Sequence, residues 1–266
     1  MKKLLFMAAT CMVVTIVSCV KTATNDQAGG KANIHVHLTD APGLFDEVNI
    51  DIKEVQVKLT ADDSDTGWQS INLVRPGVYN LLDFRNGADT LLGSLSVPAG
   101  PVNQLRLVLG SNNSVVVEGI SFPLQTPSAQ QSGLKLLINT TLSAGIDYHF
   151  TMDFDAARSI VQTGNGRFIL KPVIRIFTEA TTGAIKGSVD PAASKAWVYA
   201  IANQADTITS SPADTLTGGF LLQGIPAGAS YKVAIHATAG VYKDTTLLNV
   251  AVSNGVTANL GKITLH

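Results

Sequence analysis

Cysteine is almost absent from this chain of 266 residues, and charged residues are scarce. The two cysteines, Cys11 and Cys19, lie close together near the N-terminus, so the rest of the chain can form neither a disulfide framework nor a thiolate metal site. Charged residues make up 15% of the composition, with 19 Lys and Arg against 20 Asp and Glu. Because there is no basic excess, the electrostatic basis for nucleic-acid binding is missing, and we expect no nucleic-acid partner.

Long apolar runs are missing as well. The run from Leu4 to Val17 is shorter than the roughly 20 residues of a membrane-spanning helix, and it follows two lysines, as in a cleaved secretory signal. The sequence Ile16-Val17-Ser18-Cys19 at its end resembles the lipobox of bacterial lipoproteins, whose cysteine is lipidated and begins the mature chain. The resemblance implies a signal peptide over residues 1–18, a lipid anchor at Cys19 and a flexible tether over residues 19–31. It also implies the outer membrane of a Gram-negative bacterium, with the periplasmic and surface leaflets both left open.

Familiar catalytic motifs are also missing. The chain contains no Gly-x-Ser-x-Gly, no His-Glu-x-x-His, no phosphate-binding loop and no EF-hand loop. If Cys19 is lipidated, no nucleophilic thiol remains either. We therefore expect a protein that is not an enzyme.

The rest of the sequence alternates apolar and polar residues with the period of β-strands. In residues 48–59 the apolar phase shifts near Lys53 and Glu54, which predicts a β-bulge there. No long segment shows the helical period, so we expect no more than short helical turns within residues 81–92 and 155–161. These patterns predict an all-β fold.

A domain boundary is predicted near Glu179 to Gly183, where the small, polar segment EATTG interrupts the pattern. Residues 32–179 would form a β-rich, sandwich-like domain. Residues 183–266 contain about seven short strands spaced as in a β-sandwich. The change in amino-acid composition at this boundary suggests few contacts between the two domains. We therefore expect residues 182–266 to fold alone.

Two resemblances refine this division. The C-terminal part carries Gly183-Ala184-Ile185-Lys186-Gly187 and, further on, the sequence GFLLQGIPAG from Gly219 to Gly228. It resembles the carboxypeptidase regulatory-like modules of the prealbumin-like, carbohydrate-binding-like superfamily. This implies a seven-stranded prealbumin-like β-sandwich that serves as a scaffold or spacer, and some relatives bind glycans.

The N-terminal part carries LTDAP at residues 38–42, TPSAQQSGLK at 126–135, DFDA at 153–156 and KPVIR at 171–175. In this order the blocks resemble the lipoprotein family of domain of unknown function 4382, over about residues 31–178. The resemblance implies a β-rich domain outside the cytoplasm and offers no reaction.

Histidine and aspartate residues recur at strand spacing in two segments, where they would share one face of each strand. If the two strands pair, imidazoles and carboxylates would converge. Imidazole nitrogen suits transition ions and clustered carboxylates suit calcium, so a divalent cation is the one cofactor we consider. The candidate residues are His35, His37, Asp40, His149, Asp153 and Asp155. In the structural alternative the carboxylates pair with Arg106, Arg158, Lys171 or Arg175 and leave no coordination position.

The loop from Thr126 to Gly133 is rich in hydroxyl and amide groups and carries no charge, which suits hydrogen bonding to sugars. Its candidate ligand contacts are Thr126, Ser128, Gln130, Gln131 and Ser132. The alternative is a turn that satisfies its own polar groups.

Two further patterns concern single side chains. Trp197 and Tyr199 have the spacing of an aromatic platform on one strand face, although we expect them to pack in the core. Four Asp-Thr sequences resemble the O-glycosylation sequons of some Gram-negative bacteria. Their candidate acceptors are Thr90, Thr207, Thr215 and Thr245.

The sequence as a whole predicts a non-catalytic envelope lipoprotein that binds or presents a ligand, with glycan as the preferred class. Its membrane partner would be outer-membrane lipid, reached through Cys19. The alternative is a structural or adhesive, pilus-like subunit whose C-terminal sandwich adds an edge strand to a protein partner. A hydrolase is the third reading.

Overall fold

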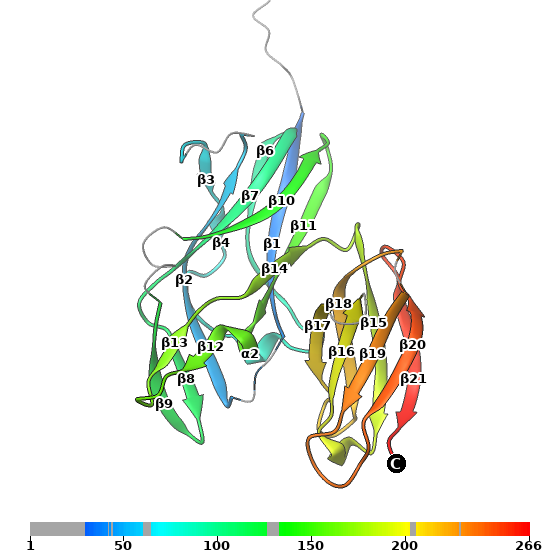
Figure 1. Cartoon of the computed structure of the whole chain (residues 1–266). Helices are drawn as coiled ribbons and strands as arrows, with labels where there is room; N and C mark the ends of the chain where they lie inside the picture. The colour runs from blue at the N-terminus through cyan, green and yellow to red at the C-terminus, as the bar shows by residue number, and fades with distance from the viewer. Residues whose placement is uncertain are drawn as a thin grey trace, which may run out of the picture.

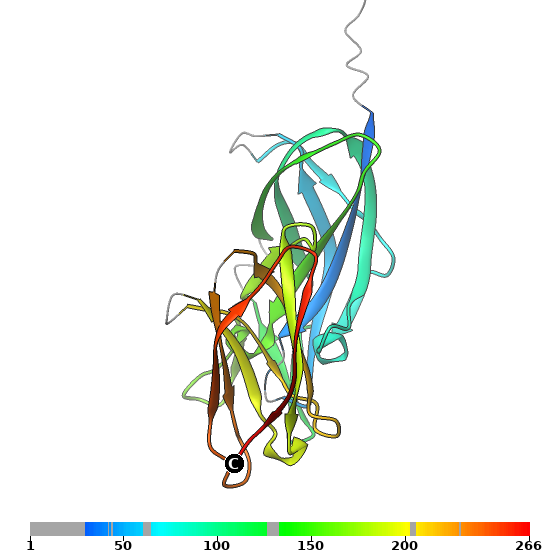
Figure 2. The ribbon, with the colours of Figure 1, turned by 90° about the vertical axis from the view of Figure 1, so that its right-hand side faces the viewer.

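The computed structural model describes residues 30–41, 43, 45–60, 65–126, 133–202, 206–228 and 230–266. It is built almost entirely of β-strands, which confirms the predicted all-β fold, and it forms two domains (Figure 1). The start of the first strand and the C-terminus lie at opposite ends of the molecule (Figure 2). Among the described residues, no helix is long and apolar enough to cross a membrane.

Two facing sheets make up the first domain. Its elements are β1 (Lys31–Ala41), β2 (Glu47–Lys58), β3 (Trp68–Ser70), β4 (Asn72–Leu73), β5 (Gly77–Asn80), η1 (Leu81–Phe84), β6 (Thr90–Pro98), β7 (Gly100–Leu109), β8 (Ser114–Val117), β9 (Ile120–Gln125), β10 (Leu134–Leu142), β11 (Asp147–Asp155), α2 (Ala156–Ser159), β12 (Ile160–Gln162), β13 (Phe168–Leu170) and β14 (Ile174–Phe177). One sheet has the order β14-β11-β1-β6-β4, and the other runs β10-β7-β2-β8-β9-β13-β12 with β3 and β5 paired to β2.

Strand alternation places the core of this domain between the sheets. Val36, Leu38 and Phe150 point inward and are buried, while their polar neighbours point outward. The predicted bulge is confirmed, because the pairing of β2 with β7 shifts register between Ile52 and Glu54. The two predicted helical turns are also confirmed as η1 and α2.

The second domain is a β-sandwich of seven strands, as predicted. Its elements are β15 (Thr182–Asp190), η2 (Ala192–Ser194), β16 (Trp197–Ala202), β17 (Asp206–Pro212), β18 (Gly219–Pro226), β19 (Ser230–His236), β20 (Thr245–Ala251) and β21 (Thr257–Thr264). The sheets have the orders β18-β15-β21 and β17-β16-β19-β20. A separate apolar core fills the space between them, with Ile185, Val198, Leu222 and Val233 fully buried.

The joint between the domains carries specific contacts, while the expectation that they are few stays a prediction. Arg175 of β14 donates hydrogen bonds to the carbonyl oxygens of Gln223 (2.7 Å) and Gly224 (2.8 Å) in β18. Leu221 packs so closely on Gly87 that a Cβ there would lie 2.3 Å from the leucine Cδ2. The local amino-acid composition cannot show these contacts, because they join residues that are far apart in the sequence.

Candidate functional site

A cleft of about 840 Å³ lies between the two domains. The first domain contributes the end of β11 and the helix α2, and the second contributes the outer faces of β16 and β17. Figure 1 shows these elements side by side across the joint. This volume falls in the range of about 300–1,000 Å³ that is typical of small-molecule sites.

Two aromatic rings, Trp197 and Tyr199, line the second-domain side of the cleft. The ring centroids are 6.3 Å apart and the planes are inclined by 27°. Val198 and Ala200, which alternate with them along β16, point into the sandwich core and are fully buried. Trp197 is nevertheless only 8% exposed, so its predicted burial is confirmed, although it lies on the face of β16 opposite the sandwich interior. Tyr199 is half-buried, so the expectation of core packing is wrong for that residue. Partial burial raises the pKa of the Tyr199 phenol.

Arg158 and Asp155 form the polar part of the first-domain side. Asp155 caps α2 by accepting a hydrogen bond from the Arg158 backbone N–H at 2.8 Å, and its other oxygen accepts one from Arg158 Nε at 2.6 Å. Because Asp155 engages Nε, the terminal amino groups of the guanidinium remain to donate to a ligand. The Arg158 side chain is 57% exposed, so a ligand in the cleft can reach it.

The opposite side of the cleft supplies further oxygen atoms. Asp206 and Thr207 are exposed at the start of β17, and Thr209 and Ser210 follow along the same strand. The cleft therefore combines an aromatic surface with a guanidinium that donates hydrogen bonds and a carboxylate that accepts them. It also contains hydroxyl groups, which can both donate and accept hydrogen bonds.

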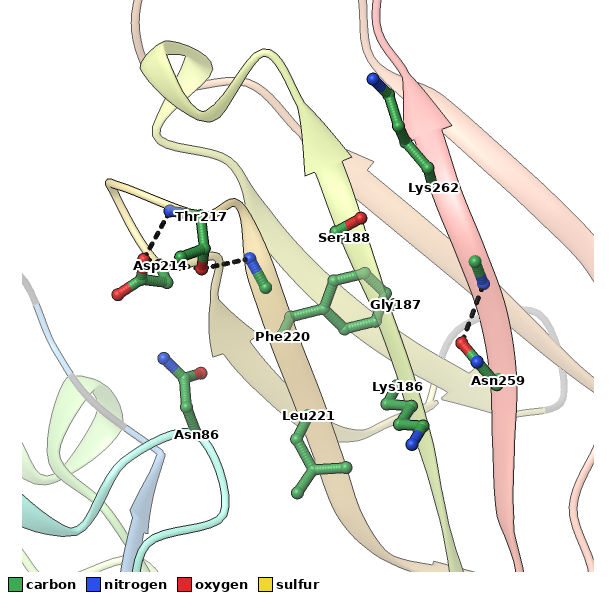
Figure 3. A pocket seen from close by; sticks show the side chains of 12 residues that line it. Asn86, Lys186, Gly187, Ser188, Asp214, Thr217, Phe220, Leu221, Asn259 and Lys262 are labelled. Carbon is green, nitrogen blue, oxygen red and sulfur yellow. Dashed lines mark hydrogen bonds between the residues drawn. The ribbon is translucent and has the colours of Figure 1, made fainter.

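A second hollow, of about 590 Å³, lies on the outer face of β15, β18 and β21 (Figure 3). Lys186 and Asn259 line it together with Asn86 of the first domain, and Leu221, which also lines it, packs on Gly87. Its acidic residue, Asp214, accepts hydrogen bonds from Thr217 and from the Leu216 backbone, which lower the pKa of the carboxyl group. Since that carboxylate is held by its own turn and no aromatic pair is present, the interdomain cleft is the better candidate site.

The six residues predicted to bind a cation lie on two strands that do pair. β1 and β11 run parallel, with His35 opposite His149 and Thr39 opposite Asp153. The imidazoles and carboxylates nevertheless form separate groups, because Asp153 lies four residue steps, or about 13 Å, along the strand from His149. Within the described part of the chain, no group of three or more His, Cys, Asp or Glu side chains is placed to hold a metal ion.

The carboxylates follow the structural alternative. Arg175 Nε donates to Asp153 Oδ2 at 2.7 Å, and Asp155 is held by Arg158. Asp40 is buried, accepts a hydrogen bond from the Ala156 backbone at 3.2 Å, and has one carboxyl oxygen without a partner. Burial raises the pKa of Asp40 well above its usual value, and the neighbouring charge of Asp153 raises it further.

The other predicted residues are placed only in part. Thr126 is buried and its hydroxyl has no hydrogen-bond partner. Thr207 and Thr215 are exposed, whereas Thr90 and Thr245 are half-buried at the starts of β6 and β20. Outside the described residues lie Cys19, Ser128, Gln130, Gln131 and Ser132. The ligand loop, the anchor and the glycosylation sites therefore stay predictions.

The fold and the cleft define an all-β protein of two domains with a cleft between them. The chain belongs to the family described as domain of unknown function (DUF4382), whose model matches residues 31–172. This confirms the resemblance seen in the first domain, while the carboxypeptidase regulatory-like resemblance of the second stays a prediction. No curated protein matches the chain.

Solved structures with some similarity include three bacterial proteins. The Bacillus anthracis TIE protein is 10% identical, with a TM-score of 0.24, and the match covers 89% of this chain but 34% of that one. A mutant of the shaft pilin spaA from Lactobacillus rhamnosus GG is 10% identical, with a TM-score of 0.24 and coverage of 89% and 97%. BcpA, the major pilin subunit of Bacillus cereus, is 11% identical, with a TM-score of 0.23 and coverage of 89% and 70%.

Proposed function

We propose that this chain is a non-catalytic envelope lipoprotein that binds a glycan in the cleft between its domains. The observation that carries the proposal is the pair of rings on the cleft wall, of which Tyr199 is half-buried and Trp197 is 8% exposed. The apolar faces of sugar rings pack on aromatic side chains, and sugar hydroxyls exchange hydrogen bonds with the groups around them. Arg158 supplies donors for those hydroxyls and Asp206 supplies an acceptor.

The charges that line the cleft favour a neutral glycan. The carboxylate of Asp155 balances the guanidinium of Arg158 at 2.6 Å. Asp206 then leaves the cleft with a small negative charge, which would repel sulfated or carboxylated sugars. The ligand class is therefore a segment of neutral oligosaccharide.

The remaining parts of the proposal rest on the sequence. The signal-like N-terminus and the Ile16-Val17-Ser18-Cys19 block support a lipid anchor at Cys19 and an outer-membrane location. The absence of the familiar hydrolase motifs from the sequence supports a binding role rather than a reaction.

The two tryptophans of the chain allow a sharp test, because the other one, Trp68, lies in the first domain and stacks on Arg106 with 3.9 Å from guanidinium carbon to ring centroid. A glycan array first identifies neutral oligosaccharides that bind. In a Trp68→Phe variant, Trp197 is the sole tryptophan, and the bound glycan should change its fluorescence emission. Trp197→Ala should weaken binding about tenfold or more, as expected for the loss of a stacking ring worth about 1.4 kcal/mol.

The matched control is the Trp68→Phe variant itself, which should bind the same glycan with unchanged affinity. The proposal is wrong if no neutral glycan binds at millimolar concentration. It is also wrong if binding survives in Trp197→Ala and disappears in Trp68→Phe.

One observation favours a structural or adhesive subunit as the second candidate. β20 and β21 each pair with a strand on one side only, so their outer edges present unpaired backbone groups to a partner strand. Co-purification of a stoichiometric protein partner from the envelope, lost when Pro is placed in β20 or β21, would support this candidate. Turnover of chromogenic esters or glycosides would instead indicate the hydrolase.

A further inference from the structure

Three histidines lie in contact on the outward face of the five-stranded sheet. His35 and His37 alternate on β1 with the fully buried Val36, and the parallel strand β11 places His149 directly opposite His35. The rings of His35 and His149 stack with centroids 4.8 Å apart, and those of His37 and His149 are 5.3 Å apart. None of the three lines the interdomain cleft.

Two ring nitrogens of this cluster converge. His37 Nε2 and His149 Nδ1 are 3.2 Å apart. Two nitrogens bound to one tetrahedral zinc ion at about 2.0–2.1 Å lie about 3.3 Å from each other. The two rings form a hydrogen bond at this distance in the structure, and the same separation is close to that of two ligands of one metal ion.

Neighbouring groups orient the rings of His37 and His35. His37 Nδ1 lies 3.0 Å from Asp89 Oδ1, and an ionised carboxylate can only accept, so Nδ1 carries the proton and Nε2 presents its lone pair. His35 Nδ1 lies 2.8 Å from Ser94 Oγ, which leaves His35 Nε2 for a ligand. Metal-binding histidines in proteins are commonly oriented in this way, by a hydrogen bond from the second ring nitrogen.

A β-bulge in β1 also affects the direction in which the His37 side chain points. The pairing of β1 with β6 shifts register between Val36 and His37. Such bulges turn the side chain at the bulge relative to a regular strand, and they are common next to functional sites. Here the bulge lies at the histidine that contacts both Asp89 and His149.

We propose that His35, His37 and His149 bind a divalent transition-metal ion of the zinc class, with Asp89 and Ser94 as positioning residues. Two nitrogens are already at ligand spacing, and the third ring, that of His35, must turn from its stack on His149 to complete the set. This turn is needed because no three such groups are placed to hold an ion in the structure as it stands, among the residues it describes. His149 is exposed, so an ion can enter from solvent.

The chemistry of the ligands selects the metal. Imidazole nitrogen suits zinc, copper and nickel, whereas calcium and magnesium require oxygen ligands. The aspartates at the other end of β11 are held by arginines and cannot supply them. The proposal is independent of glycan binding, because no residue is shared between the two sites.

Calorimetric titration of the tag-free, chelator-treated, detergent-solubilised chain with zinc tests the proposal. We expect binding at submillimolar zinc and none of calcium, and a tetrahedral absorption spectrum when cobalt replaces zinc. His37→Gln and His149→Gln should each reduce zinc affinity by about tenfold or more, and Asp89→Asn should reduce it by about 10- to 100-fold.

The chain provides a matched control in His236, a surface histidine that also contacts a carboxylate, that of Asp244 at 2.6 Å, but lies on β19 of the second domain. His236→Gln should bind zinc like the unmodified chain. Circular dichroism of each variant checks that the fold is retained. The proposal is overturned if zinc does not bind at submillimolar concentration. It is also overturned if His37→Gln and His149→Gln leave the affinity unchanged, or if His236→Gln abolishes binding.

Discussion

Replacement of Arg175 by Met should both destabilise the first domain and uncouple it from the second. The guanidinium of Arg175 pairs with Asp153, with Nε at 2.7 Å and a terminal nitrogen at 2.5 Å from the same carboxylate oxygen. Its terminal nitrogens also donate to the carbonyl oxygens of Gln223 and Gly224. The side chain of Asp153 is 6% exposed and that of Arg175 is 26% exposed, so the pair is largely shielded from water.

The magnitude follows from what the substitution leaves behind. Breaking a buried ion pair by removing one partner costs about 3–5 kcal/mol, because the remaining charge is buried without compensation. Arg175 is partly exposed, so we expect the lower end, about 3 kcal/mol. For a chain of 150–250 residues, 1 kcal/mol lowers the midpoint of thermal unfolding by about 2–4 °C, which gives a fall of about 6–12 °C.

Differential scanning calorimetry measures both effects. Arg175→Met should lower the first transition and separate it from that of the second domain. Adding Asp153→Asn to this variant should recover part of the loss, since no charge then remains buried. Ser211→Ala, which removes a single interface hydrogen bond to Asn86, is the control and should cost no more than about 1.5 kcal/mol. A midpoint of Arg175→Met within about 2 °C of the unmodified chain would refute the reasoning.

Three further predictions follow from the structure and the sequence. The raised pKa of Asp40 means that the native state keeps this proton above the usual carboxyl pKa, so its contribution to stability is present at low pH and lost as pH rises through the raised pKa. Asp40→Asn should therefore gain stability relative to the unmodified chain between pH 4 and pH 7 in urea unfolding, and a constant difference would contradict this. Because the second domain has its own core, residues 182–266 should fold alone, and a far-UV spectrum of an unfolded chain would show otherwise. Cys19→Ala should leave an unlipidated form that no longer stays with outer-membrane vesicles after a carbonate wash, and retention there would disprove the anchor.

Strand alternation explains which parts of the fold could be predicted. The period of two identifies strands and bulges from neighbouring residues alone, and it places His35 and His37 on one face. It cannot say that β1 pairs with β11, because Asn33 and its partner Asp147 are 114 residues apart and nothing local encodes that pairing. It also cannot say which face of a strand meets the core. On β16 the small side chains of Val198 and Ala200 fill the sandwich interior, whereas Trp197 is buried on the opposite face and Tyr199 beside it is half-buried.

The position of the second domain explains why Asp153 and Asp155 are held in ion pairs, whereas His149, another of the six predicted cation ligands, stays exposed. The second domain packs against the end of the sheet where Asp153 and Asp155 lie, and a carboxylate removed from water requires a compensating partner. Arg175 and Arg158 meet that requirement, which leaves those carboxylates no free coordination position. Further back along β11, His149 stays exposed, and a neutral imidazole there can keep a lone pair without the cost of a buried charge. Coverage of the sheet by the second domain, which no single strand pattern can reveal, therefore determines which polar residues stabilise the joint and which remain able to bind a ligand.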